Sequence, residues 1–245
     1  MYIKYSKLKS PKNPSEKIWR YMDYTKFMSL LIKNSLFFCR VDKLGDEHEM
    51  SLPLLNRIEH QKIYQKSKSE FKEGMREVVW NKMFDIIKSS ALVNSWHRNE
   101  YESAAMWNIY MKTSEGIAIQ STFSRLRDCF HETTDEVKIG IIEYIDYNKD
   151  KIKNDCLTGY LSHKQKSYEH EQELRAIITN QNNKRMKPLY KIGKYVHVDL
   201  NLLVETVYIA PNSPDWFHDL VVDSTKAFGY NFNIIKSSLK DQSIH

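Results

Sequence analysis

The chain has 245 residues, with 41% hydrophobic and 28% charged side chains, which is typical of one or two globular domains with a sizeable core. Its 7 glycines, 6 prolines, 5 Trp, 15 Tyr and 10 Phe argue against long linkers and disorder. The formal charge of +6 permits contact with nucleic acid or another polyanion without requiring it.

The cysteines and the N-terminal segment predict a cytoplasmic protein with reduced thiols. Cys39, Cys129 and Cys156 are far apart and form no Cys-x-x-Cys pair, so neither a zinc site nor a disulfide framework is indicated. The N-terminus has no apolar signal core, and no apolar run reaches membrane-spanning length. We expect no membrane partner, and the sequence predicts no oligomeric state.

The first part of the chain predicts strand, helix and strand in succession. Residues 1–17 are predicted as an extended entry segment, because "SPKNPSEK" is rich in residues that break regular structure. "WRYM" is a short strand, "DYTKFMSLLIKN" is a helix with Asp23 as its cap, and "SLFFCRV" is a strand. Residues 18–245 are predicted as one domain, with a helical insertion at about 57–89.

The rest of the chain continues this irregular alternation. "ALVNSW" and "GIAIQST" are predicted strands, separated by a short helix that Ser103 caps. The last helix is predicted to have Ser213 as N-cap and Pro214 as its first residue, and to end at Gly229. We therefore predict an α+β (mixed α/β) fold with a central, largely antiparallel or split β-sheet flanked by helices.

The stretch "SYEHEQELRAII", residues 167–178, is the first candidate for a site. On a strand, Leu174, Ala176 and Ile178 share one face, while Glu173 and Arg175 share the other. Glu171 comes just before them. Glutamate is a poor strand former, so this face is expected to lie against water or a cleft. Either the strand is half-exposed with a weak surface ion pair, or one glutamate is a catalytic or ligand-orienting carboxylate held by the guanidinium.

The stretch "NSWHRNEYESAAMWNIY" is the second candidate. Ser95 lies at the end of a predicted strand, where sites often form. Trp107 and Tyr110 are three residues apart and share a face of the following helix. Trp107 either packs in the core or stacks on a ligand. Ser95 and Tyr110 either satisfy buried backbone groups or line a site.

Arg20 is a third candidate, because a cation lies in a predicted strand between Trp19 and Tyr21. Its head group either projects into solvent or binds an anionic ligand.

The loop "RVDKLGDEHE" is rich in groups that hold hard cations. Asp42, Asp46, Glu47, His48 and Glu49 could bind a metal, but the loop lacks calcium-loop spacing, so a solvated acidic loop is the alternative. Walker-type GxxxxGK[ST], GxGxxG, GxSxG and zinc-deaminase patterns are absent from the sequence.

Three stretches together resemble a known family. "WRYMDYTKFMSLLIKNSLFFCRVDKLGDEHE", "VNSWHRNEYESAAMWNIYMKTSEGIAIQS" and "KSYEHEQELRAII" resemble, in that order, the bacterial family called domain of unknown function 2971. The resemblance covers roughly residues 18–180, and "LLVETVYIAPNSPDWFHDLV" also looks like family sequence. One departure is "GDEHE" in place of an Asp-Pro-Phe-Glu-like loop.

More remotely, the order of these elements is similar to that of ADP-ribosyltransferase-type toxins, which is a fold-level analogy. The resemblance implies an effector in a toxin or phage-defence setting, with NAD as cofactor, no metal, and a nucleic acid or protein as target. Arg20, beside Tyr21, would hold the phosphate or ribose, and Ser95 would order the nicotinamide side. Trp107 or Tyr110 would stack on nicotinamide.

In the same analogy, Glu171 or Glu173 would bind a ribose hydroxyl and stabilise the developing positive charge, with Arg175 as its partner or as a ligand contact. Two other functions remain open. One is a non-catalytic interaction module, in which the charges are structural and Trp107 is core. The other is a metal-dependent nuclease using Asp46, Glu49 and the two later glutamates.

Overall fold

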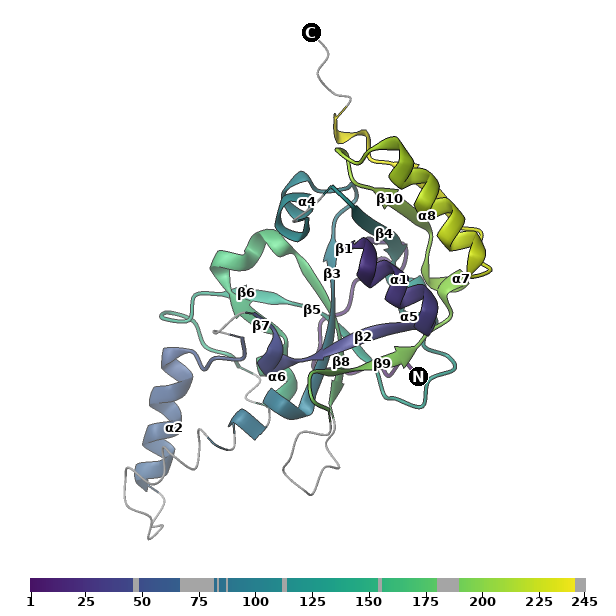
Figure 1. Ribbon diagram of the computed structural model, residues 1–245. Coiled ribbons are helices and arrows are strands. Elements are labelled where there is room, and N and C mark those ends of the chain that lie inside the picture. Colours follow the sequence, from purple (N-terminus) through teal and green to yellow (C-terminus); the bar gives the residue numbers. More distant parts are fainter. Residues whose placement is uncertain are drawn as a thin grey trace.

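The computed structural model describes residues 1–45, 49–66, 82, 84–86, 88–111, 114–153, 156–179 and 190–240. These residues form a single α+β domain built on a nine-stranded sheet with helices against it (Figure 1). The predicted fold class is confirmed.

The nine strands form one sheet of the order β11-β10-β4-β1-β3-β2-β9, and β8 joins it by pairing with both β3 and β5. All of these pairings are antiparallel except that of β10 with β11, as the sequence predicted. The strands are β1 Lys17–Asp23, β2 Ser35–Arg40, β3 Ala91–Arg98, β4 Gly116–Thr122, β5 Lys138–Ile141, β8 Glu173–Thr179, β9 Gly193–His197, β10 Thr206–Ile209 and β11 Asn233–Lys236.

The sheet forks at β3. One edge of β3 pairs with β8 along seven residues. The other edge is divided, because β2 pairs with it only at Leu92 and Val93 and β1 only at His97 and Arg98. Between these two pairings, β1 and β2 separate, and no strand of the described residues pairs with the Asn94–Trp96 stretch of this edge.

Side chains bridge the fork where backbone pairing stops. The Asn94 amide Nδ2 donates to the carbonyl oxygen of Phe37 on β2 at 2.9 Å. From the other side, Arg20 Nη1 donates to the carbonyl oxygen of Ser95 at 2.6 Å. One backbone carbonyl of β2 and one of β3 are satisfied in this way without closing the sheet.

The two faces of the sheet are covered differently. One face carries the main core, in which side chains of α1, α5, α7 and α8 pack on alternate strand residues. The helices are α1 Tyr24–Lys33, α5 Phe123–Asp128, α7 Leu200–Leu203 and α8 Asp215–Ala227. The opposite face carries two smaller clusters, one around Trp19 and Trp107 and one around Val93 and Ile177. The site forms at the fork, next to both of these clusters.

Local signals place most of these helices. Asp23 caps α1, where its side chain accepts from Lys26 N, and Asn34 ends it in the left-handed conformation. Ser103 caps α4 (Ala104–Tyr110) as predicted. The predicted start of α8 is wrong by one residue: Pro214 is the N-cap, and the Ser213 hydroxyl donates to Ser114 O.

The remaining predictions on organisation fall partly outside the described residues. Helix α2 (Leu54–Lys66) begins the predicted insertion and projects away from the sheet (Figure 1). Residues 84–86 and 88–90 are helical, whereas 67–81 lie outside the described part. The N-terminal segment runs along Val137, which exchanges backbone hydrogen bonds with Met1 and Ile3.

The three cysteines are not joined in disulfides. In the described ranges, no helix combines the length and the apolar character that crossing a membrane requires.

Candidate functional site

A cavity of about 650 Å³ opens at the fork of the sheet, where residues of β1, β2, β3, β8 and α1 line it, and it lies within the usual size range of small-molecule sites. Seven of the eight predicted site residues line it, and Trp107 is the one that does not. The seven are Arg20, Tyr21, Ser95, Tyr110, Glu171, Glu173 and Arg175. Residues as distant in sequence as Arg20 and Arg175 therefore meet at one place.

Strand register explains how the acidic end of the cavity is assembled. His97 faces Glu173 and Ser95 faces Arg175 across the β3–β8 ladder, and residues directly opposite share a face. Glu171 reaches the same cavity from η2 (Lys166–Glu171), the short 3-10 helix before β8. Gln172 joins them in the left-handed conformation with φ of 40°, so the two glutamates do not follow simple strand alternation.

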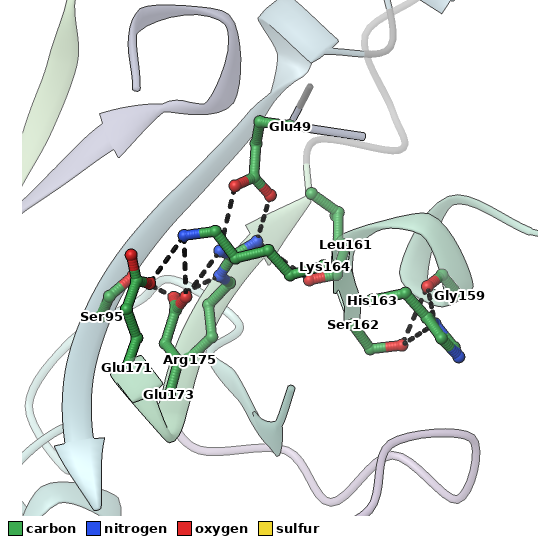
Figure 2. Close-up of polar contacts among 10 residues, drawn as sticks. All are labelled: Glu49, Ser95, Gly159, Leu161, Ser162, His163, Lys164, Glu171, Glu173 and Arg175. Carbon is green, nitrogen blue, oxygen red and sulfur yellow. Dashed lines mark hydrogen bonds and ion pairs between the residues drawn. The ribbon is translucent and has the colours of Figure 1, made fainter. Parts of the chain in front are cut away.

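Arg175 is held on every donor it has (Figure 2). Its Nε and Nη2 donate to Glu173 at 2.6 and 2.9 Å. Its Nη1 and Nη2 donate to Glu49 at 2.6 and 3.3 Å, and Nη1 also donates to the Leu161 carbonyl oxygen at 3.1 Å. These contacts use all five N–H groups of a guanidinium, so Arg175 positions carboxylates and has no donor left for a ligand.

The alternative of a weak surface ion pair is therefore wrong, because the ion pair is buried. Arg175 is 1%, Glu49 3% and Glu173 4% exposed. Two carboxylates around one guanidinium compensate the buried charge, because buried ions are tolerated only when they are paired and hydrogen-bonded.

Glu173 is fixed as an anion. Its carboxylate accepts from the Ser95 hydroxyl and from Arg175, and Lys164 Nζ lies 3.8 Å from Oε2. Burial alone would raise its pKa, but the charge of Arg175, with its hydrogen bonds and Lys164, outweighs burial and lowers the pKa. The Tyr144 hydroxyl, in β6 (Glu143–Ile145), accepts from the Glu173 backbone N–H at 2.8 Å and fixes the start of β8.

Glu171 is the carboxylate that remains open to a ligand. Its Oε2 accepts from Lys164 at 2.7 Å, and its side chain is 21% exposed. Within the described ranges, Oε1 has no hydrogen-bond partner. Lys164, in β7 (His163–Gln165), thus lies between Glu171 and Glu173, and these charges raise its pKa against the lowering effect of burial.

Arg20 is the cation that remains open to a ligand. One of its five N–H groups donates to Ser95 O, and its guanidinium lies 5.9 Å from the Trp96 ring centre. No carboxylate of the described residues forms an ion pair with it, whereas Lys26, Lys164 and Arg175 in the same cavity are all paired. Burial lowers its pKa, so a bound anion would offset an existing desolvation cost.

The predicted aromatic residues also differ in whether a ligand could reach them. Tyr110 is 46% exposed and stacks on Tyr21 with ring centres 6.5 Å apart, so its outer face is accessible. The Tyr21 hydroxyl accepts from Ser103 N and holds the start of α4. Trp107 is 1% exposed, donates to Glu102 and packs edge-on against Tyr21 at 5.0 Å. Its core alternative is what the structure shows, and it cannot stack on a ligand.

Three residues complete the site in roles that the sequence did not predict. Lys164 lies in a three-residue strand with no distinctive pattern, and Glu49 suggested a cation loop rather than an arginine partner. His97 is 5% exposed and lines the cavity, and its Nδ1 lies 2.7 Å from the Glu171 carbonyl oxygen. Because a carbonyl only accepts, Nδ1 carries the proton, and His97 helps to fix the backbone of Glu171.

The predicted cation loop is only partly described, since Asp46, Glu47 and His48 lie outside the described residues. Across the ranges that the structure covers, no group of three or more His, Cys, Asp or Glu side chains could hold a metal ion. Glu49, the described acid nearest that loop, binds Arg175 instead.

Comparison with protein-family models gives no match for this chain. A search of curated proteins also finds no match.

Proposed function

We propose that the cavity binds NAD and that the protein transfers ADP-ribose from it to a macromolecule. The observation that carries this proposal is that Arg20, a cation with no ion-pair partner among the described residues, meets an open carboxylate, Glu171, in one cavity with an accessible aromatic face, Tyr110. The cation suits a phosphate, the carboxylate suits a ribose hydroxyl, and the aromatic face suits a nicotinamide ring.

The role of each residue follows from the hydrogen-bonding groups or ring face that its contacts within the protein leave free. Arg20 would hold the pyrophosphate with its remaining N–H groups, and the Tyr110 ring would support nicotinamide. Glu171 Oε1 would accept a hydrogen bond from the ribose. Glu173 keeps a fixed negative charge nearby, because Ser95, Arg175 and Lys164 hold it in place.

The reaction breaks the bond between ribose C1′ and nicotinamide N1, and the electron pair leaves with nicotinamide. Positive charge then develops on the ribose. Carboxylates fixed in a cavity stabilise that charge more than they stabilise the ground state, which is the condition for catalysis. A nucleophile of the target bonds to C1′ and gives its proton to Glu171.

Glu171→Gln tests the proposal, because it keeps the side chain's shape and removes its charge. We expect the wild-type chain to release nicotinamide from NAD and the variant to lose at least ~100-fold in rate. High-performance liquid chromatography measures nicotinamide, and labelled NAD reports transfer to proteins or nucleic acids of a bacterial lysate. Glu169→Gln, two residues away, is the matched control and should act like wild type.

Two results would reject the proposal. If the wild-type chain releases no nicotinamide with or without lysate, the reaction is wrong. If it releases nicotinamide and Glu171→Gln does so equally well, the site is wrong. NAD binding without turnover would favour the interaction-module alternative.

A further inference from the structure

A second aromatic group lies at the far end of the same cavity from Glu173. Phe37 of β2 and Tyr195 of β9 are directly opposite in the strand register and both line the cavity. Their ring centres are 5.1 Å apart with planes tilted by 59°. Tyr195 is 43% exposed, so its ring is open to a flat ligand.

Neighbouring residues hold Phe37 and Tyr195, which together form an aromatic corner of the cavity, in fixed positions. A Cβ on Gly193 would lie 2.2 Å from the Phe38 carbonyl oxygen and 2.6 Å from the Phe37 ring, so only glycine lets β9 approach that closely. The Tyr195 hydroxyl shares a 2.8 Å hydrogen bond with Ser29 of α1, and Lys33 Nζ lies 6.0 Å from the ring centre. The corner is held in place before any ligand binds.

The strand order sets the distance between the two ends of the cavity. Glu173 is on β8, Ser95 on β3, Phe37 on β2 and Tyr195 on β9, which are successive neighbours. Three spacings of about 4.8 Å make roughly 15 Å, and the separation of β2 from β3 at the fork adds to this distance. Arg20 donates to Ser95 O at the fork, on the edge of β3 that faces β2. The Arg20 cation, which has no ion-pair partner in the described ranges, therefore lies between a carboxylate end and an aromatic end of the cavity.

From this order we propose that Tyr195, with Phe37, forms a stacking subsite for the adenine base of a nucleotide whose phosphates contact Arg20. The inference rests on the proposed function, in which NAD is the full ligand. It adds that the Tyr195 end of the cavity holds the adenine end of NAD and that the Glu173 end holds the nicotinamide end. Stacking on an aromatic ring accepts a base through its π-face.

Calorimetric titration of the full chain with AMP, ADP-ribose and nicotinamide mononucleotide tests the subsite. Tyr195→Ala should weaken AMP and ADP-ribose binding by about tenfold and leave nicotinamide mononucleotide within about twofold. Tyr195→Phe keeps the ring and should bind AMP as wild type does. Tyr195→Leu keeps bulk without the ring and guards against a folding defect, which thermal melting would reveal. Tyr101, 76% exposed and absent from the cavity lining, supplies the control Tyr101→Ala.

The possible outcomes test the adenine subsite and the proposed reaction separately. AMP binding that depends on the Tyr195 ring, without any NAD turnover, supports the subsite and rejects the proposed reaction. NAD turnover with a KM that Tyr195→Ala and Tyr195→Leu leave unchanged rejects the subsite and keeps the reaction. If the wild-type chain binds neither AMP nor ADP-ribose, or if nicotinamide mononucleotide weakens as much as AMP, the subsite is overturned.

Discussion

Arg175 and Arg20 are both guanidinium groups in one cavity, yet only Arg20 has donors left for a ligand. The sequence pattern Glu-x-Glu-x-Arg placed Glu173 and Arg175 on one side of a strand, and that prediction is confirmed by their contact. It could not show that the pair is buried, because Glu49 lies 126 positions away and no local pattern links it to Arg175.

The buried Glu49–Arg175–Glu173 set predicts an unequal response to substitution. Glu49→Gln keeps one acceptor oxygen and should lower the free energy of unfolding by about 2 kcal/mol. Arg175→Met leaves two buried carboxylates close together and should lower it by about 4 kcal/mol. Urea unfolding at pH 7 measures both.

The matched control is Glu59→Gln. Glu59, on α2, forms an exposed ion pair with Lys151, and its loss should leave the free energy of unfolding almost unchanged. An Arg175→Met variant as stable as Glu49→Gln would show that Arg175 does not hold the two carboxylates together.

Elements, unlike the charged network, were largely predictable from local sequence. Asp23 and Ser103 begin helices where the sequence predicted them, because a cap depends on residues within one turn. The start of α8 was misplaced because Ser213 and Pro214 both favour a helix N-terminus. The tertiary contact of the Ser213 hydroxyl with Ser114 O decided between them.

The cap of α1 predicts a pH-dependent contribution to stability. Burial alone would raise the pKa of Asp23, but hydrogen bonds from Lys26 and Thr25 lower it from 3.8 to about 2. A depressed folded-state pKa stabilises the fold above the ordinary carboxyl pKa, and this contribution is lost as the pH falls through about 2. Asp23→Ala should therefore cost about 1 kcal/mol at pH 7 and progressively less below pH 4.

Urea unfolding of both proteins at pH 7, 4 and 2.5 gives that difference directly. Asp23→Asn, which keeps a capping oxygen without a titrating group, should stay close to wild type at pH 7. A difference between Asp23→Ala and wild type that is the same at every pH would rule out the titration of Asp23 as its source.

At the scale of the whole molecule, the fork at β3 creates the site. Separation of β1 from β2 leaves Arg20 and Ser95 at an unpaired strand edge beside the Glu173 end of β8. The sequence predicted a largely antiparallel or split sheet, but not the strand order, because β8, β9 and β10 pair with strands far back in the chain. That order is what places Phe37 and Tyr195 in the same cavity.

The central claim is that this cavity holds NAD through Arg20, and calorimetric titration of NAD into the wild-type chain, Arg20→Ala and Arg57→Ala tests it most directly. Arg57 lies exposed on α2, outside the cavity, and its variant is the control. We predict one NAD per chain, at least about tenfold weaker binding for Arg20→Ala, since a charged hydrogen bond contributes roughly 1.5–3 kcal/mol, and no change for Arg57→Ala. Absence of NAD binding to a folded wild-type chain, or equal affinity in Arg20→Ala, would contradict the claim.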